Sequence, residues 1–198
     1  MTNNLSHVGY GKGCEIITKK GTIFQSNTGY KLITKKLIQA IKEQYALNWY
    51  GIHGIRHWGR VYANGLRLAE GTGAKVSVVK MFSIFHDSRR LNDGSDEAHG
   101  PRGAKLAEEF RGKYFELPDD EFELLIIACN QHTVLQIHTD ITIQTCFDAD
   151  RLDLARVGTM PDPRYLCTDL AKNSDIIAWA NERSLSDYSP AIVTLWNQ

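Results

Sequence analysis

From residue 32 onward, helix-length segments with apolar side chains at helical spacing alternate with short breaks that contain glycine or proline. In the first segment, Leu32, Ile33, Leu37, Ile38 and Ile41 fall on one helix face. Residues 52–69, 75–87, 98–110, 121–132 and 141–155 also read as helices, separated by Gly71, Gly73, Gly94, Gly112 and Pro118. A last helix is expected from Thr168, as its N-cap, to about Glu182. The pattern predicts an all-α bundle.

The first 30 residues do not share this pattern. Two short β-branched runs, residues 14–18 and 22–25, flank the turn Lys19-Lys20-Gly21 and predict a small hairpin. The glycines before it follow no strand and open no helix, so they do not indicate a dinucleotide-binding loop. We therefore expect residues 1–30 to form a β-hairpin-like appendage and residues 31–198 to form one helical domain, a length typical of a single core.

Charge and apolar content exclude several classes of protein. The 23 Lys and Arg balance 23 Asp and Glu, so nonspecific binding to nucleic acid is not expected. The longest strongly apolar run, residues 124–129, is far shorter than a membrane span, and the N-terminus has no signal-peptide pattern. The four cysteines form no C-x-x-C pair, which indicates free thiols. We expect a cytoplasmic protein that does not bind membranes.

Histidine is concentrated in the middle of the chain. Six of the seven histidines lie between positions 53 and 138, in a part of the chain that also carries an excess of acidic over basic residues. Four motifs hold most of them, together with several carboxylates: His53-Gly-Ile-Arg-His57-Trp-Gly-Arg60-Val61, Phe85-His86-Asp87, His99-Gly-Pro-Arg102-Gly103-Ala104 and Cys146-Phe-Asp148-Ala-Asp150-Arg151-Leu-Asp153. In the first motif, His53 and His57 are expected on one helix face.

Each motif alone has an ordinary structural explanation, such as a salt-bridged helix end or a hydrogen-bonded core histidine. Taken together they indicate a metal, because His86 and Asp87 follow a strongly apolar segment and Asp150 lies between Phe147, Ala149 and Leu152. Burying such groups is costly unless a partner neutralises them. A divalent cation held by two imidazoles and two carboxylates would compensate all four groups, and this donor set suits first-row ions or magnesium.

The order of the motifs, H-x-x-R-V, H-D, H-G-x-x-G-A and then D-A-D-R-L-D, resembles the HD superfamily of metal-dependent phosphohydrolases. The resemblance covers roughly residues 50–156 and implies an all-helical HD-domain bundle. It implies His57 as the first ligand, His86 and Asp87 as the central pair, and Asp150 as the last ligand, with Asp148 as the alternative. It also implies one or two divalent ions, drawn from Mn, Co, Ni, Fe, Mg and Zn.

Further residues are candidates for the same site. His99 and His132 stand where elaborate branches of the superfamily bind a second metal, and either could instead contact phosphate. A bound ion would lower the pKa of a coordinated water from ~16 toward ~7 and polarise a phosphoryl oxygen. Arg89 and Arg90 are the first candidates to stabilise charge on the phosphate, followed by Arg102 and Arg151, because a guanidinium fork matches phosphate geometry. Asp87 is expected to orient the water as well as bind the ion.

The resemblance implies hydrolysis of a phosphomonoester, phosphodiester or phosphoanhydride in a small molecule, with a nucleotide as the favoured substrate. The guanosine-polyphosphate hydrolase branch carries a Glu-Asp pair where this chain has Ser88, Arg89 and Arg90, and the Gly-Tyr-Pro signature of the cyclic-dinucleotide branch is missing. Two alternatives remain open. One is a di-iron oxygenase on the same scaffold, and the other is a noncatalytic metal-containing module whose basic N-terminal segment contacts a partner.

Overall fold

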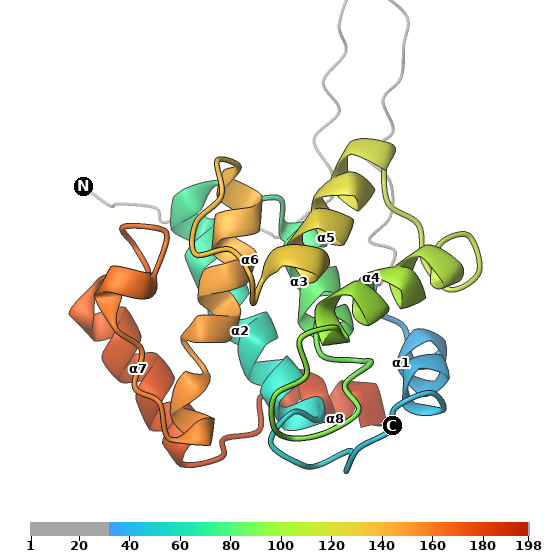
Figure 1. Cartoon of the computed structure of the whole chain (residues 1–198), viewed down its shortest axis with the longest axis horizontal. Helices are drawn as coiled ribbons and strands as arrows, with labels where there is room; N and C mark the ends of the chain where they lie inside the picture. The colour runs from blue at the N-terminus through green and yellow to red at the C-terminus, as the bar shows by residue number, and fades with distance from the viewer. Residues whose placement is uncertain (1–31, 198) are drawn as a thin grey trace, which may run out of the picture. The chain divides into compact units, whose positions relative to one another are not determined.

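The computed structural model describes residues 32–197, drawn in colour in Figure 1. The chain divides at about residue 30, and the description below concerns the part after it. The predicted N-terminal hairpin lies outside the described residues. Residues 32–197 contain eight α-helices, two short 3-10 helices and no β-strand, which confirms the all-α prediction.

The helices are joined by connections of varied length, the longest being those between α1 and α2 and between α3 and α4. They are α1 (Lys35–Lys42), α2 (Ile55–Thr72), α3 (Val76–Phe85), α4 (His99–Phe110), α5 (Asp119–Gln131), α6 (Ile141–Arg151), η1 (Leu154–Val157), η2 (Pro163–Tyr165), α7 (Ser174–Leu185) and α8 (Ala191–Asn197). Within the described part of the chain, no helix is both long enough and apolar enough to cross a membrane.

Helix α2 lies at the centre of the bundle and packs against α3, α6, α7 and α8, while α4 and α5 pack on each other beside α3 (Figure 1). The main core between these helices contains the fully buried Trp58, Phe82, Phe85 and Phe147. Burying each such side chain contributes about 1.5–3 kcal/mol. A second, smaller apolar cluster, which includes Leu68, Leu152 and Ala180, holds α7 to the bundle.

Local sequence explains where several helices begin and end. The hydroxyl of Thr34 accepts a hydrogen bond from the Leu37 amide at the start of α1, and Asp140 caps α6 in the same way through the amides of Thr142 and Ile143. Helix α2 ends at Gly73, which has φ +74° and so takes the left-handed conformation that glycine adopts without steric cost.

The H-G-x-x-G-A motif allows α4 to approach its neighbours closely. A Cβ atom on Gly103 would lie 2.2 Å from the carbonyl oxygen of Phe85, and one on Gly100 would lie 2.3 Å from the carbonyl oxygen of Cys129. Only hydrogen fits at these two positions. The N-terminus of α4 can therefore lie directly against the C-terminal ends of α3 and α5, which brings His99 next to the residues that follow them.

The structure corrects several expected boundaries. His53 precedes α2 and does not share a helix face with His57, because Gly54 is the N-cap in extended conformation. Helix α7 begins at Ser174 with Asn173 as its cap, not at Thr168. Thr168 caps only a short turn, through the Ala171 amide, and its own hydroxyl and amide donate to Asp148. Helix α8 was not expected from the sequence. Of the expected free thiols, Cys129, Cys146 and Cys167 are free and buried, whereas Cys14 lies outside the described residues.

Candidate metal centre

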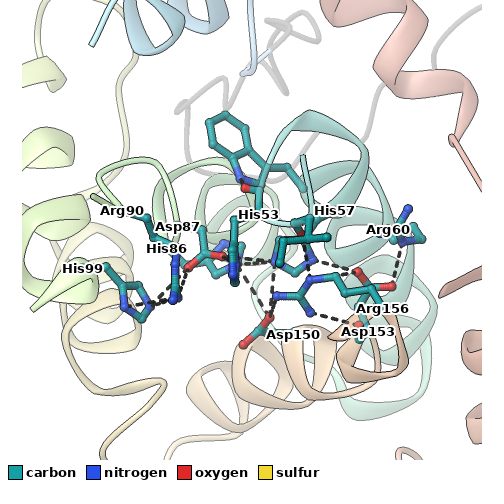
Figure 2. A network of polar contacts seen from close by, with 12 residues as sticks. His53, His57, Arg60, His86, Asp87, Arg90, His99, Asp150, Asp153 and Arg156 are labelled. Atoms are coloured by element: carbon teal, nitrogen blue, oxygen red, sulfur yellow. Dashed lines mark hydrogen bonds and ion pairs between the residues drawn. The ribbon is translucent and has the colours of Figure 1, made fainter. Parts of the chain in front are cut away.

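The His and Asp residues of the four motifs meet where helix ends converge. His57 lies in the first turn of α2, His86 and Asp87 directly follow α3, and His99 opens α4. His132 directly follows α5, and Asp150 lies near the end of α6. Figure 2 shows several of these side chains in a row, from His99 at one end through Asp87, His53 and His57 to Arg60 at the other. The imidazole and carboxylate side chains therefore meet at the centre of the bundle because each stands at or near the end of a helix.

The first group comprises His57, His86 and Asp150, whose ligand atoms lie close enough together to hold a metal ion. The Nε2 atoms of His57 and His86 are 3.0 Å apart. Asp150 Oδ1 lies 3.4 Å from the first of these atoms and 3.7 Å from the second. Both imidazoles are fully buried, and the Asp150 side chain is 15% exposed, so solvent reaches this group beside the carboxylate.

The second group comprises Asp87, His99 and His132, and it too could hold a metal ion. The Nε2 atoms of His99 and His132 are 2.9 Å apart, and Asp87 Oδ1 lies 3.2 Å from His99 Nε2. The other oxygen of the same carboxylate, Oδ2, lies 3.5 Å from His57 Nε2. Asp87 therefore stands between the two groups and presents one oxygen to each.

Every imidazole in the two groups is oriented by a hydrogen bond from its Nδ1 atom. His86 donates to the carbonyl oxygen of Phe82 at 3.1 Å, His132 donates to that of Cys129 at 2.9 Å, and His99 donates to that of Asp96. His57 Nδ1 lies 2.7 Å from Asp153 Oδ2. Metal-binding histidines commonly have such partners, which fix the tautomer and aim the other nitrogen at the ion.

These bonds determine which nitrogen carries the proton. A carbonyl oxygen and an ionised carboxylate can only accept, so Nδ1 of His86, His99 and His132, and that of His57 beside Asp153, must be protonated. In each neutral ring Nε2 then carries a lone pair. Two such lone pairs facing each other at 2.9–3.0 Å repel one another unless a proton or a cation lies between them. Each group thus has a local need for positive charge between its two imidazoles.

Burial and neighbouring charges shift the pKa values in the centre. Loss of hydration lowers the pKa of His86 to about 3, although Asp87 and Asp150 oppose the shift. Burial also lowers the pKa of His99. For the carboxyls, burial acts in the opposite direction but is outweighed. His86, Arg156 and His57 lower the pKa of Asp150 to about 2, and the neighbouring histidines hold the pKa of Asp87 well below its usual range. Neutral imidazoles and ionised carboxylates are the forms that bind metal ions.

Two arginines face the groups from opposite ends. Arg90 Nη1 lies 3.5 Å from Asp87 Oδ1 and 3.4 Å from both ring nitrogens of His99, so it lies across that ring. At the other end, Arg156 Nη2 lies 4.0 Å from Asp150 Oδ1. Its remaining donors bond to the carbonyl oxygens of Ile52 and Asp153. Each side chain is less than 10% exposed.

Other expected residues are not brought to the two groups. Arg89 donates to the backbone and side chain of Gln44, and Arg102 bonds to the Arg89 carbonyl oxygen and to Asp96. Arg151 donates to three backbone carbonyl oxygens, those of Leu135, Gln136 and Tyr165. These three arginines therefore hold loops together and do not line the centre.

Asp148, the alternative last ligand, also has a different role. Its carboxylate accepts hydrogen bonds from the amides of Cys167 and Thr168 and from the Thr168 hydroxyl. Burial raises its pKa, against the effect of these three bonds. The geometry therefore favours Asp150, and not Asp148, as the ligand from α6.

Sequence reasoning did not identify Asp153 and Arg156 as parts of the site, and it predicts only a structural or ligand-supporting role for His53. Asp153 joins His57 to Arg60, whose Nε donates to Asp153 Oδ1 at 2.7 Å. His53 Nδ1 lies 2.9 Å from Asp87 Oδ2. The available signal was position: Asp153 ends the D-A-D-R-L-D motif, and Arg156 follows it after one helical turn. Two surface pockets, of about 560 and 310 Å³, are lined by residues outside the centre.

Comparison with known proteins adds no assignment. No family model and no curated protein matches this chain, and no solved structure matches its fold. Support for a function therefore comes from the residues of the centre and from their geometry.

Proposed function

We propose that the protein is a metal-dependent hydrolase of the HD phosphohydrolase type. Its substrate is the phosphomonoester, phosphodiester or phosphoanhydride of a small molecule, with a nucleotide as the favoured class. The order of the four motifs along the chain supports the family assignment, and the all-helical bundle is compatible with it. The convergence of those motifs at helix ends supports the position of the site.

One observation carries the metal part of the proposal, namely the two pairs of opposed Nε2 atoms. In each pair the tautomers leave lone pairs facing one another at 2.9–3.0 Å, with a carboxylate oxygen within 4 Å. Hydrogen bonding alone does not satisfy this arrangement without added protons, whereas a cation satisfies it directly. Imidazole and carboxylate donors suit Mn, Fe, Co, Ni and Zn, and the carboxylates also suit Mg. We therefore propose one divalent ion in each group, with Asp87 shared between them.

When bound, such ions supply hydroxide near neutral pH and polarise a phosphoryl oxygen. The residues of the chain account for the rest of the site. Arg90 and Arg156 are the two guanidinium groups at the ends of the centre, and they are placed to stabilise negative charge that develops on a phosphoryl group between them. Arg156 thus joins Arg90 beside the two groups. Arg89, Arg102 and Arg151, which the sequence also suggested for this role, bond elsewhere.

The proposal is tested by metal analysis and hydrolysis assays on the same preparations. His86→Ala and Asp87→Ala should each lose bound metal together with activity on a panel of nucleotides and phosphate esters, assayed with added Mn, Co, Ni and Mg. His138→Ala is the matched control, because His138 bonds only to the backbone of the Asp140 cap and lies outside both groups. Full metal content in both site variants would overturn the proposal.

A di-iron oxygenase is the second candidate, favoured by one specific feature. Four imidazoles surround a single carboxylate, Asp87, whose two oxygens face different groups, and this nitrogen-rich set suits iron as well as it suits the other ions. An iron chromophore with substrate-dependent oxygen consumption, and no hydrolysis of any phosphate ester, would favour this candidate over the hydrolase.

A further inference from the structure

Asp187, in the turn after α7, has φ 47° and is the one non-glycine residue with positive φ among residues 32–197. Helices commonly end in a left-handed residue, and glycine is the usual choice because other residues meet steric strain there. The chain places aspartate at this position instead. Aspartate adopts this conformation more readily than most residues because its short polar side chain can hydrogen-bond nearby, and such positions persist where the surrounding structure holds them.

The Asp187 carboxylate is held by two arginines of α2. Oδ1 accepts a hydrogen bond from Arg60 Nη1 at 3.0 Å, and Oδ2 forms a short ion pair with Arg56. Arg60 Nη1 also donates to the carbonyl oxygen of Tyr188 at 3.1 Å. Arg60 is only 3% exposed, whereas the Asp187 side chain is 56% exposed. The exposed Asp187 carboxylate therefore compensates part of the positive charge of the buried Arg60 guanidinium.

The contacts continue from Arg60 to the metal centre. Arg60 Nε donates to Asp153 Oδ1 at 2.7 Å, and the other oxygen of Asp153 lies 2.7 Å from His57 Nδ1. Figure 2 shows Arg60, Asp153 and His57 in this order. Asp187, Arg60, Asp153 and His57 are thus linked in this order by hydrogen bonds, from a surface turn to an imidazole of the first ligand group. The first three of these side chains alternate in charge.

We propose that Asp187 is a positioning residue for the metal centre, acting on His57 through Arg60 and Asp153. This inference rests on the proposed metal site and extends it to a residue outside the H-x-x-R-V and D-A-D-R-L-D motifs. Asp187 touches neither metal nor substrate. Asp187 determines how strongly Arg60 interacts with Asp153. This interaction in turn determines how strongly Asp153 accepts the hydrogen bond from His57 Nδ1.

The physical reason is competition for one carboxylate. With Asp187 present, the charge of Arg60 is shared between Asp187 and Asp153. Without Asp187, Asp153 is the carboxylate left to compensate the buried Arg60 guanidinium, and its Oδ2 already lies 3.8 Å from Arg156 Nε. With more of its charge engaged by arginine, Asp153 becomes a weaker acceptor for His57. A weaker acceptor leaves the imidazole less basic at Nε2 and less fixed in orientation, and both changes weaken a metal ligand.

The test uses the full chain with Asp187→Asn and Asp187→Gly. Asparagine tolerates the left-handed conformation and keeps one acceptor, whereas glycine removes the strain and the side chain together. Asp119→Asn is the matched control, since Asp119 pairs with Arg111 on the surface and has no contact with the two ligand groups. The measurements are the dissociation constant for Co²⁺, the visible spectrum of the Co²⁺-loaded protein, and the Tm of the metal-free protein.

Partners of metal-bound histidines change metal affinity by about 10–100-fold when removed. Asp187 acts two contacts beyond such a partner, through Arg60 and Asp153, so the effect should be at or below the lower end of this range. We expect the Co²⁺ dissociation constant to rise about threefold in Asp187→Asn and about tenfold in Asp187→Gly, with a shifted Co²⁺ spectrum. Both metal-free variants should lose some Tm, because Arg60 loses part of its compensating charge. A metal-free protein that still unfolds cooperatively, together with a shifted Co²⁺ spectrum, separates positioning from a loss of the fold. The control should match wild type.

Two outcomes separate this inference from the proposed function. If wild type binds Co²⁺ and both Asp187 variants bind it within twofold of wild type with an unchanged spectrum, the positioning role is overturned and the metal site stands. If wild type binds no divalent ion, the proposed metal site is overturned, and the positioning role falls with it.

Discussion

The amide and hydroxyl of Thr168 both donate to Asp148 Oδ2 at 2.8 Å. Asp148 lies two residues before Asp150 on α6, and positions two apart on a helix point about 200° away from each other. One carboxylate of the pair therefore holds the segment that leads to α7, while the other faces the imidazoles of His57 and His86. Two acidic residues of one motif have different functions because the helix turns between them.

This division predicts opposite effects for the two alanine variants. Asp148→Ala leaves three donors without an acceptor in the interior and should lower the free energy of unfolding by about 3 kcal/mol, with metal content unchanged. Asp150→Ala should lose metal and keep most of its stability. Denaturant unfolding and elemental analysis measure both effects. Metal loss in Asp148→Ala with retention in Asp150→Ala would reverse the assignment.

The second ligand group predicts the number of bound ions. Wild type should bind two equivalents of a divalent ion, and His132→Ala should reduce this to about one, because His99 Nε2 then loses its partner at 2.9 Å. His57→Ala should weaken the other group. Metal titration with elemental analysis provides the count. Two equivalents in His132→Ala, or one in wild type, would show that His99 and His132 do not hold an ion.

The adjacent arginines Arg89 and Arg90 offer a matched kinetic comparison. Arg90→Lys should lower kcat/KM for a phosphate ester by about 100-fold, because lysine cannot reproduce the guanidinium across His99 and beside Asp87. Arg89→Lys should change it less than about threefold, since Arg89 contacts Gln44 instead. Equal losses in the two variants would contradict this placement.

The buried histidine predicts how stability depends on pH. In the metal-free protein the pKa of His86 falls from 6.5 to about 3, so the unfolded chain takes up this proton more readily than the folded one. The contribution of neutral His86 to the free energy of unfolding is therefore fully present above pH 6.5. It is lost as the pH falls toward 3, by at most about 1.4 kcal/mol per pH unit.

The carboxyl of Asp150, with its pKa lowered from 3.8 to about 2, adds a loss only below pH 4. Denaturant unfolding between pH 7 and pH 3, with a chelator present, measures both windows. In His86→Gln, the free energy of unfolding should change with pH less steeply near pH 5, by the amount that corresponds to about one bound proton. A wild-type stability that does not change between pH 7 and pH 4 would contradict the burial of a neutral His86.

Much of the fold could be predicted because it depends on local periodicity. The apolar spacing in segments such as residues 98–110, together with the intervening glycines, locates α1 to α6 to within a few residues. The predicted helix over residues 141–155 is divided in the structure into α6 and the 3-10 helix η1. Helix α7 was placed too early because the hydroxyl of Thr168 suits an N-cap equally well in local sequence. Thr168 does cap a short turn, since its hydroxyl accepts a hydrogen bond from the Ala171 amide, but α7 begins only after Asn173. The other partner of the hydroxyl, Asp148, is twenty residues away, so no local rule finds it.

The cost of burying imidazoles and carboxylates among apolar residues indicates a metal site in this part of the chain. The resemblance of the motif order to the HD superfamily then implies His57, His86, Asp87 and either Asp150 or Asp148 as ligands. Local sequence could not choose between Asp150 and Asp148, between Arg90 and Arg89, or between the two roles considered for His99 and His132. Those choices depend on which side chains from distant segments meet, as His99 and His132 do across 33 positions. The position of Arg156 and the link from Asp187 to His57 likewise arise only where α2, α6 and the turn after α7 pack together, because a hydrogen bond depends on distance in space and not on separation in sequence.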